Sequence, residues 1–166
     1  MSSSDRSVDL DTRSGLLVDT NLLVLFVVGS INRKRIEKFK RTSQYSESDY
    51  DLLVRVLGQF KTLYTVAHVM AEVSNLTDLS GRELQQGRSL LQETLTILQE
   101  PVVASERAAR SVHYESLGLT DAAIAELARE HNCAVLTDDL SLYLTLSNEG
   151  ITALNFTHLR ASNWRA

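Results

Sequence analysis

The chain of 166 residues contains very little cysteine or proline, with one of each, Cys133 and Pro101. A single cysteine excludes an internal disulfide framework, and it excludes structural zinc sites that need several cysteines. One proline and seven glycines exclude collagen-like and low-complexity chains. We therefore expect an ordinary globular protein of a reducing compartment, most simply the cytoplasm, with a single domain.

Long hydrophobic runs are also missing. The most apolar stretch, residues 16–28, is interrupted by Asp19 and Asn21 and is shorter than the ~20 residues of a membrane-spanning helix. We predict no membrane segment and no secretory signal. The balance of 21 acidic and 17 basic residues gives a net charge of −4. This argues against wrapping DNA by bulk charge, but not against a nucleic-acid enzyme, because the distribution of charge decides that.

Strand-like and helical patterns alternate along the chain, which favours a parallel sheet with helices on both faces. Residues 1–14 are polar and predict a flexible tail, followed by one domain over residues 15–166. Short buried strands are predicted at 16–18, 63–66, 102–104, 134–137 and 151–154. A capping box from Ser80 to Glu83 predicts the start of a helix that Pro101 ends, and residues 106–117 predict one short helix.

Four carboxylates occur at corresponding places in this alternation. Asp19 ends the first strand, Glu72 lies on the helix after the second, Asp121 begins a helix, and Asp139 follows the strand that ends at Thr137. Ligands of open α/β sheets bind beyond the carboxyl ends of the strands. If these ends converge, the four acids form one pocket whose oxygen ligands select Mg²⁺ or Mn²⁺.

Each acid also has a simpler interpretation. Asp121 or Asp139 alone is most often a helix N-cap, and Glu72 alone a solvated helix residue. Asp19 differs, because it lies inside an apolar run where a charge is costly without partners. Carboxylates brought together raise one another's pKa, and a divalent cation would offset their repulsion. The joint pattern therefore favours a site.

The four acidic segments resemble the motifs of the PIN-domain nuclease family. They read Leu17-Val18-Asp19-Thr20-Asn21, Ala71-Glu72-Val73, Leu119-Thr120-Asp121-Ala122 and Val135-Leu136-Thr137-Asp138-Asp139. The resemblance covers about residues 15–155 and implies a three-layer α/β/α sandwich with a central, mostly parallel sheet. It also implies metal-dependent cleavage of phosphodiester bonds, usually in RNA, with Asp19, Glu72, Asp121 and Asp139 as catalytic residues and metal ligands.

The resemblance assigns supporting roles as well. The fourth motif of the family usually reads Thr-x-Asp, which selects Thr137 and Asp139 and leaves Asp138 as an extra acid that could assist or substitute. Asn21 matches a polar residue two positions after the first acid. Many small stand-alone members are VapC-type toxins paired with an antitoxin, and the resemblance implies a homodimer. The stretch 30–48 is longer and more basic than in minimal toxins.

That stretch holds the strongest basic cluster of the sequence. Its cationic residues are Arg33, Lys34, Arg35, Lys38, Lys40 and Arg41, set against Glu37. Phosphate contacts, with Arg33, Lys34 and Arg35 as the first candidates, would position an RNA strand without reading its sequence. The alternative is a solvated helix face.

Three other interpretations compete with a PIN nuclease. A ribonuclease-H-like fold uses the same order of acids but needs antiparallel strands directly after Asp19, and residues 22–28 contain no turn residue. A receiver domain needs a lysine late in the chain, whereas the last lysine is Lys61. A PIN-like scaffold that binds nucleic acid or protein without cutting stays open. We predict a metal-dependent endoribonuclease, the toxin of a toxin–antitoxin pair, with an RNA-processing or defence nuclease as the alternative.

Overall fold

The computed structural model describes residues 11–163. Four strands, β1 (Leu16–Val18), β2 (Leu63–Tyr64), β3 (Ala134–Thr137) and β4 (Ala153–Asn155), form a parallel sheet in the order β2-β1-β3-β4. The central strands β1 and β3 are buried throughout, which explains why both read as apolar runs without alternation. The prediction of a mostly parallel sheet is confirmed.

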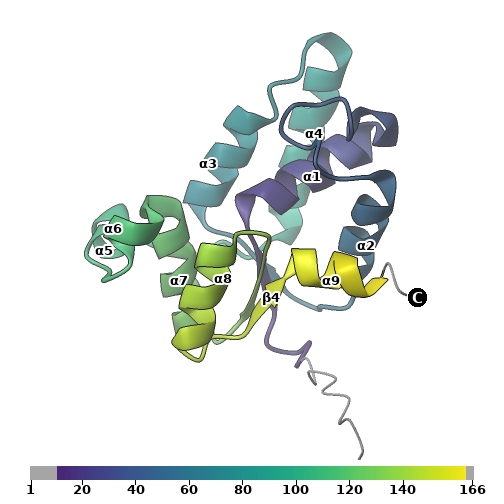
Figure 1. The fold of residues 1–166 in the computed structure, drawn as a ribbon. Helices are drawn as coiled ribbons and strands as arrows, with labels where there is room; N and C mark the ends of the chain where they lie inside the picture. Colours follow the sequence, from purple (N-terminus) through teal and green to yellow (C-terminus); the bar gives the residue numbers. More distant parts are fainter. Residues whose placement is uncertain (1–10, 164–166) are drawn as a thin grey trace, which may run out of the picture.

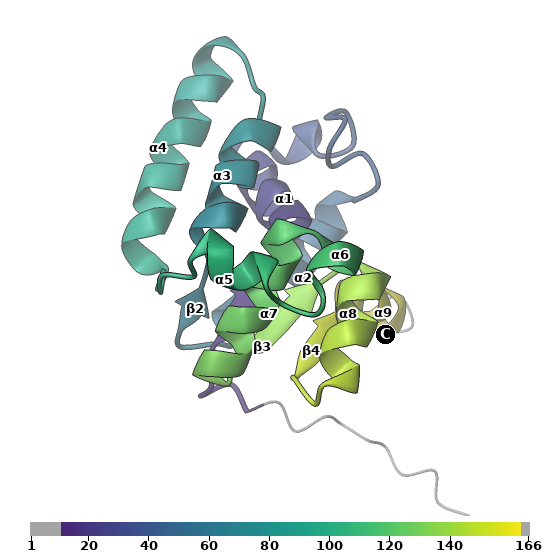
Figure 2. The ribbon, with the colours of Figure 1, turned by 90° about the vertical axis from the view of Figure 1, so that its left-hand side faces the viewer.

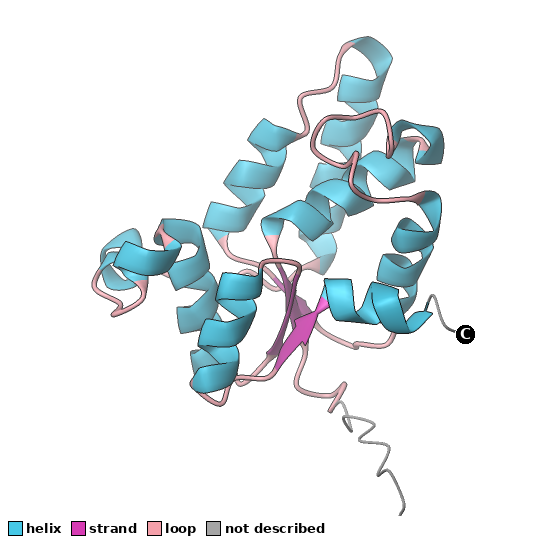
Figure 3. Cartoon of the chain, in the orientation of Figure 1, coloured by secondary structure: helices cyan, strands magenta, loops and turns pink. Residues whose placement is uncertain are grey.

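Helices enclose this sheet. They are α1 (Thr20–Ile31), the short 3₁₀ helix η1 (Arg33–Arg35), α2 (Glu47–Gly58), α3 (Ala67–Leu76), α4 (Gly81–Ile97), α5 (Ser105–Ala109), α6 (Tyr114–Leu117), α7 (Leu119–His131), α8 (Leu140–Asn148) and α9 (Phe156–Asn163). Helices α7 and α8 cover one face of the sheet, and α1 and α2 lie on the other (Figures 1 and 2). Figure 3 shows the strands between these layers. The expected three-layer sandwich is confirmed.

Helix α1 connects the sheet to most of the other helices. It is apolar on nearly every side because it packs against α2, α3 and α4. Its residue Gly29 lies so close to the ring of Tyr50 in α2 that an added Cβ would come within 2.3 Å of Tyr50 Cδ2. Glycine is therefore needed for this approach. Since α1 begins directly after β1, this packing also fixes the end of the first strand.

Three predicted strands differ from the structure, and the last of them differs only in its bounds, which are 153–155 instead of 151–154. The second covers only residues 63–64, and Thr65 and Val66 lead into α3. The strand predicted at 102–104 does not form. Instead, Gln99 makes a parallel bridge with Tyr64: its N–H donates to Leu63 O at 2.8 Å, and Thr65 N–H donates to Gln99 O at 2.9 Å. The edge of the sheet is thus paired before Pro101 rather than after it.

The other differences between the predicted and the observed elements concern the residues at which helices begin and end. Ser80 makes no side-chain cap hydrogen bond, because Gly81 takes φ +56° and Glu83 turns to Arg35 instead. A reciprocal capping box forms at Ser46 and Asp49. The helix predicted over residues 106–117 is two short helices, α5 and α6.

Of the predicted tail over residues 1–14, the structure describes only residues 11–14. Residues 1–10 of the predicted tail lie outside the described residues, so the tail and the domain boundary at residue 15 stay predictions. Within residues 11–163, no helix has the length and apolarity needed to cross a membrane.

Candidate active site

Asp19 is fixed at the carboxyl ends of the two central strands. Its backbone N–H donates to Leu136 O in β3 at 3.0 Å, which ties the end of β1 to β3. Its carboxylate caps α1 by accepting from Leu22 N at 3.3 Å, and it also accepts a hydrogen bond from the hydroxyl of Thr137. The side chain is only 5% exposed. Three hydrogen bonds therefore hold this buried residue, two of them to its carboxylate.

Thr137 joins the first and fourth acidic segments. While its hydroxyl donates to Asp19, it accepts the backbone N–H of Asp139 at 3.0 Å. Asp139 in turn caps α8 by accepting from Leu142 N at 3.0 Å. The predicted supporting role of Thr137 thus has a structural basis: one fully buried hydroxyl sets the spacing of two carboxylates.

Glu72 is held by two threonines. The hydroxyl of Thr20 donates to one of its oxygens at 3.0 Å, and the hydroxyl of Thr120 donates to the other at 2.5 Å. Thr20 follows Asp19 and Thr120 precedes Asp121, so Glu72 on α3 is linked to both segments that carry the neighbouring acids. These threonines were not among the predicted site residues, although each is adjacent to a predicted acid.

The four predicted acids line one cavity of about 180 Å³, called here the acidic cavity. Its lining residues are Asp19, Thr20, Asn21, Glu72, Leu76, Asp121 and Asp139. The predicted polar residue Asn21 therefore also faces the site. The structure brings together side chains from α1, α3, α7 and the β3–α8 turn at the carboxyl ends of the strands. This is the convergence that the alternation of strands and helices predicts.

Burial and repulsion both act on these carboxylates. Burial raises the pKa of Asp19 to about 7, and the charge of Asp138 adds to the increase. Burial likewise raises the pKa of Asp121 to about 6, with the charges of Asp139 and Glu72 adding to it. Both ionised forms are thus held at a cost in free energy. A cation in the cavity would lower this cost for both residues.

The donor set fits a hard divalent cation such as Mg²⁺ or Mn²⁺, because it consists of carboxylate oxygens with an amide and a hydroxyl nearby. Within residues 11–163, no three acidic, histidine or cysteine side chains already stand at the geometry of an ion site. Both oxygens of Glu72 bond to threonines, and Asp19 and Asp139 each cap a helix. Shared ligation therefore needs side-chain rotation inside the cavity.

Comparison with protein families matches residues 16–145 to the PIN domain. The chain belongs to the PIN-domain family. PIN domains are in general metal-dependent nucleases, and this supports a hydrolase that acts on nucleic acids. No curated protein matches the chain. All four acids of the acidic cavity fall inside the matched range, as do Asn21 and Thr137.

Asp138 of the PIN domain faces a different environment from Asp139. It accepts a hydrogen bond from the hydroxyl of Tyr45 and one from Gln44 Nε2 at 3.4 Å. Its Oδ1 atom is buried and has no hydrogen-bond partner among the described residues. Arg160 lies over the ring of Tyr45, 5.3 Å from its centroid, and bonds to Asp49 and to Gln44 O. Asp138 therefore connects the acidic segment to the residues before α2 and to α9, a connection that the sequence analysis missed.

The basic residues Arg33, Lys34 and Arg35 do not line the acidic cavity. Arg33 pairs with Glu47 at 3.3 Å and Asp51 at 2.7 Å on α2, and Arg35 pairs with Glu83 at 3.1 Å on α4. In the described part of the chain, Lys34 has no ion-pair partner. The two arginines thus fasten η1 to neighbouring helices.

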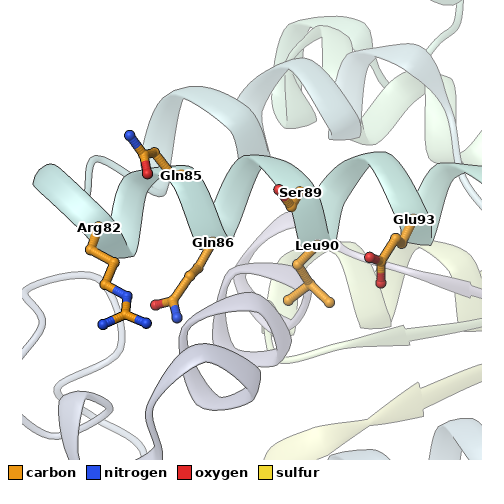
Figure 4. Close-up of a pocket in the computed structure, with 6 residues that line it drawn as sticks. All are labelled: Arg82, Gln85, Gln86, Ser89, Leu90 and Glu93. Carbon is orange, nitrogen blue, oxygen red and sulfur yellow. The ribbon is translucent and has the colours of Figure 1, made fainter.

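A separate hollow of about 400 Å³ runs along α4. It is lined by Arg82, Gln85, Gln86, Ser89, Leu90 and Glu93, all on one helix (Figure 4). It holds one cation and one carboxylate, and therefore no constellation of the kind found in the acidic cavity.

The raised pKa of Asp19 predicts how the stability of the metal-free chain depends on pH. The folded chain holds a proton on Asp19 up to about pH 7, whereas the ordinary value is 3.8. The folded state therefore binds more protons between these values, and the free energy of unfolding falls as the pH rises through this window. Asp19→Asn should flatten this fall and raise the unfolding temperature above pH 7, by about 2 °C or more.

Thermal unfolding by circular dichroism in EDTA across this range measures the effect. Asparagine keeps one oxygen, which can still accept from Leu22 N, while its amide nitrogen takes the place of the oxygen that faces Thr137 and can donate to that hydroxyl. Glu37→Gln, at an exposed position outside the acidic cavity, is the control and should follow the parent curve. A variant Asp19→Asn that is less stable than the parent above pH 7 contradicts the account.

The bond between Tyr45 and Asp138 predicts a loss of stability in Tyr45→Phe. Phenylalanine keeps the ring beneath Arg160 but leaves the partly buried Asp138 carboxylate without its main donor. We expect the free energy of unfolding to decrease by about 1–3 kcal/mol. Urea denaturation measures this value.

Tyr143→Phe is the matched control, because the Tyr143 hydroxyl makes no hydrogen bond within residues 11–163. It should cost less than about 0.5 kcal/mol. A double-mutant cycle with Asp138→Asn isolates the pair. Equal effects of the two Tyr→Phe changes would refute a specific role for the Tyr45 hydroxyl.

Proposed function

We propose that this PIN domain is a metal-dependent endoribonuclease that hydrolyses RNA phosphodiester bonds with Mg²⁺ or Mn²⁺ held by Asp19, Glu72, Asp121 and Asp139. The observation that carries the proposal is that four acids from four separate elements, from position 19 to position 139, line one cavity at the carboxyl ends of parallel strands. A set of N-caps and solvated helix residues without a common role would not be expected to converge in this way.

Each side chain has a part in this chemistry. Asp19 and Asp121 would bind the ion directly, because they are the buried or half-buried acids whose ionisation is costly without it. Glu72 and Asp139 would complete the ligands or orient a water molecule. A bound divalent cation would supply Lewis-acid stabilisation of the phosphate and would lower the pKa of a coordinated water. Asn21 could donate its amide to the substrate from the rim of the cavity.

Binding of the ion should release protons, because two of the carboxyl groups that bind it have raised pKa values. Asp19 and Asp121 must lose their protons before they can bind the ion, and burial raises their pKa to about 7 and about 6. Affinity for the ion should therefore increase as the pH rises through this range. Thr137, Thr20 and Thr120 would limit the directions in which the carboxylates can turn.

The proposal is tested by cleavage of a labelled single-stranded RNA in Mg²⁺ or Mn²⁺. EDTA should abolish cleavage, and Asp19→Asn or Asp121→Asn should reduce its rate by more than about 100-fold, because each removes a ligand of the ion. Glu37→Gln should cleave at the parent rate. Mn²⁺ should also raise the unfolding temperature of the parent chain at alkaline pH but not that of Asp19→Asn.

Absence of cleavage of RNA and DNA in either metal would reject the nuclease and favour a PIN scaffold that binds without cutting. Cleavage that survives Asp19→Asn would reject the assigned site.

We further propose that the chain is the toxin of a toxin–antitoxin pair and that it acts as a homodimer in the cytoplasm. The resemblance to small stand-alone PIN toxins supports this assignment, whereas the long basic stretch 30–48 favours the alternative, a processing or defence nuclease without an antitoxin. Both versions use the same acidic cavity, so the biological role is independent of the chemistry.

A growth assay separates the two roles. For a toxin, expression of the parent chain should arrest growth, expression of Asp19→Asn should not, and co-expression of a small protein encoded next to it should restore growth. Harmless expression of an active nuclease would contradict the toxin role and leave a processing or defence role.

A further inference from the structure

A second cavity adjoins the acidic one and has the opposite charge. It has a volume of about 350 Å³ and is lined by Phe39, Lys40, Arg41, Asn75, Leu76 and Asp78; we call it the basic cavity. Leu76, at the end of α3, lines both cavities. The segment between α1 and α2, which carries residues 39–41, therefore lines a cavity that meets the acidic cavity at Leu76; Figure 1 shows the course of this segment from α1 to α2.

The cations of the basic cavity are available to a ligand. Arg33 and Arg35 of the same segment already pair with carboxylates of α2 and α4. Within residues 11–163, neither Lys40 nor Arg41 forms an ion pair. Two cations face one carboxylate, that of Asp78, in this cavity. The cavity therefore favours an anion, and Phe39 adds an apolar aromatic surface on which a base could stack.

We infer that the basic cavity holds the sugar–phosphate backbone of a single-stranded nucleic acid next to the bond that is cut. The inference rests on the proposed function, because it requires that the acidic cavity holds the scissile phosphate. The next phosphate of the strand would then lie on the other side of Leu76, in the basic cavity. Lys40 and Arg41 then contact phosphate oxygens and set the position of the strand without reading its sequence. The substrate contacts thus lie at Lys40 and Arg41 rather than at Arg33, Lys34 and Arg35.

Asp78 allows a second test, in which the expected change in RNA affinity has the opposite direction. A carboxylate in the same cavity repels a phosphate, so its removal should strengthen binding while removal of the cations weakens it. Any electrostatic attraction of a phosphate gives these two signs, so the comparison that tests the cavity itself is between variants of equal charge inside and outside it.

The experiment measures binding of a fluorescein-labelled single-stranded oligoribonucleotide of mixed sequence by anisotropy. The chain carries Asp19→Asn, so that it does not cut, and Mg²⁺ is present. We expect the double variant Lys40→Gln/Arg41→Gln to bind about tenfold more weakly or worse, and its plot of log affinity against log salt to be shallower by about 1.4, which is about 0.7 per lost phosphate contact. Asp78→Asn should bind more tightly.

The matched control is Lys34→Gln/Lys38→Gln, which removes the same charge from the same segment outside the cavity. Its affinity should stay within about twofold of the parent, because neither lysine lines the basic cavity and salt screens exposed charges. Equal weakening by both double variants, or unchanged binding in Lys40→Gln/Arg41→Gln, overturns the inference, and in the second case an acidic peptide of a protein partner becomes the candidate ligand.

Cleavage assays distinguish this failure from failure of the proposed function. In the active chain, Lys40→Gln/Arg41→Gln should raise KM with little change in kcat, since the acids are untouched. An active nuclease whose KM ignores this change overturns the basic cavity alone. A parent chain that neither cuts nor binds RNA overturns both proposals.

Discussion

The structure depends on the placement of a buried carboxylate, Asp19, at the end of a buried strand. Desolvation and the neighbouring Asp138 and Asp121 all disfavour its charge, and they raise its pKa to about 7. The chain compensates with one backbone and one hydroxyl donor, from Leu22 and Thr137. Such an arrangement costs stability in the metal-free chain. A ligand of opposite charge that binds the same oxygens would offset this cost, and this is the reason for proposing a metal site here.

Threonine hydroxyls organise the acids around Asp19. Thr137 couples Asp19 to Asp139, while Thr20 and Thr120 hold Glu72 between the segments of Asp19 and Asp121. The acids are therefore linked in pairs through neutral donors rather than through arginine or lysine. Because no lysine or arginine within residues 11–163 pairs with these four acids, the cavity keeps the negative potential that attracts a divalent ion. The adjoining basic cavity lies outside this network and attracts the opposite charge.

The sequence allowed the convergence of the four acids to be predicted, because two of them lie at the ends of elements. Asp19 directly follows β1 and Asp139 lies two residues after β3, and their role as N-caps proved compatible with a place in the cavity. Partners that depend on tertiary placement could not be predicted. Arg33 and Arg35 read as free cations until α2 and α4 brought Glu47, Asp51 and Glu83 beside them. Residues 102–104 had strand-like composition, but the edge of β2 was already paired with Gln99.

The central claim is that the four acids together form one binding site for a divalent cation. Crystals grown with Mn²⁺ and measured at an X-ray energy where manganese scatters anomalously test it most directly. The account predicts an anomalous peak in the acidic cavity, in contact with oxygens of Asp19 and Asp121, and loss of that peak in Asp19→Asn. Manganese bound elsewhere on the chain, with the acidic cavity holding only water, would contradict it.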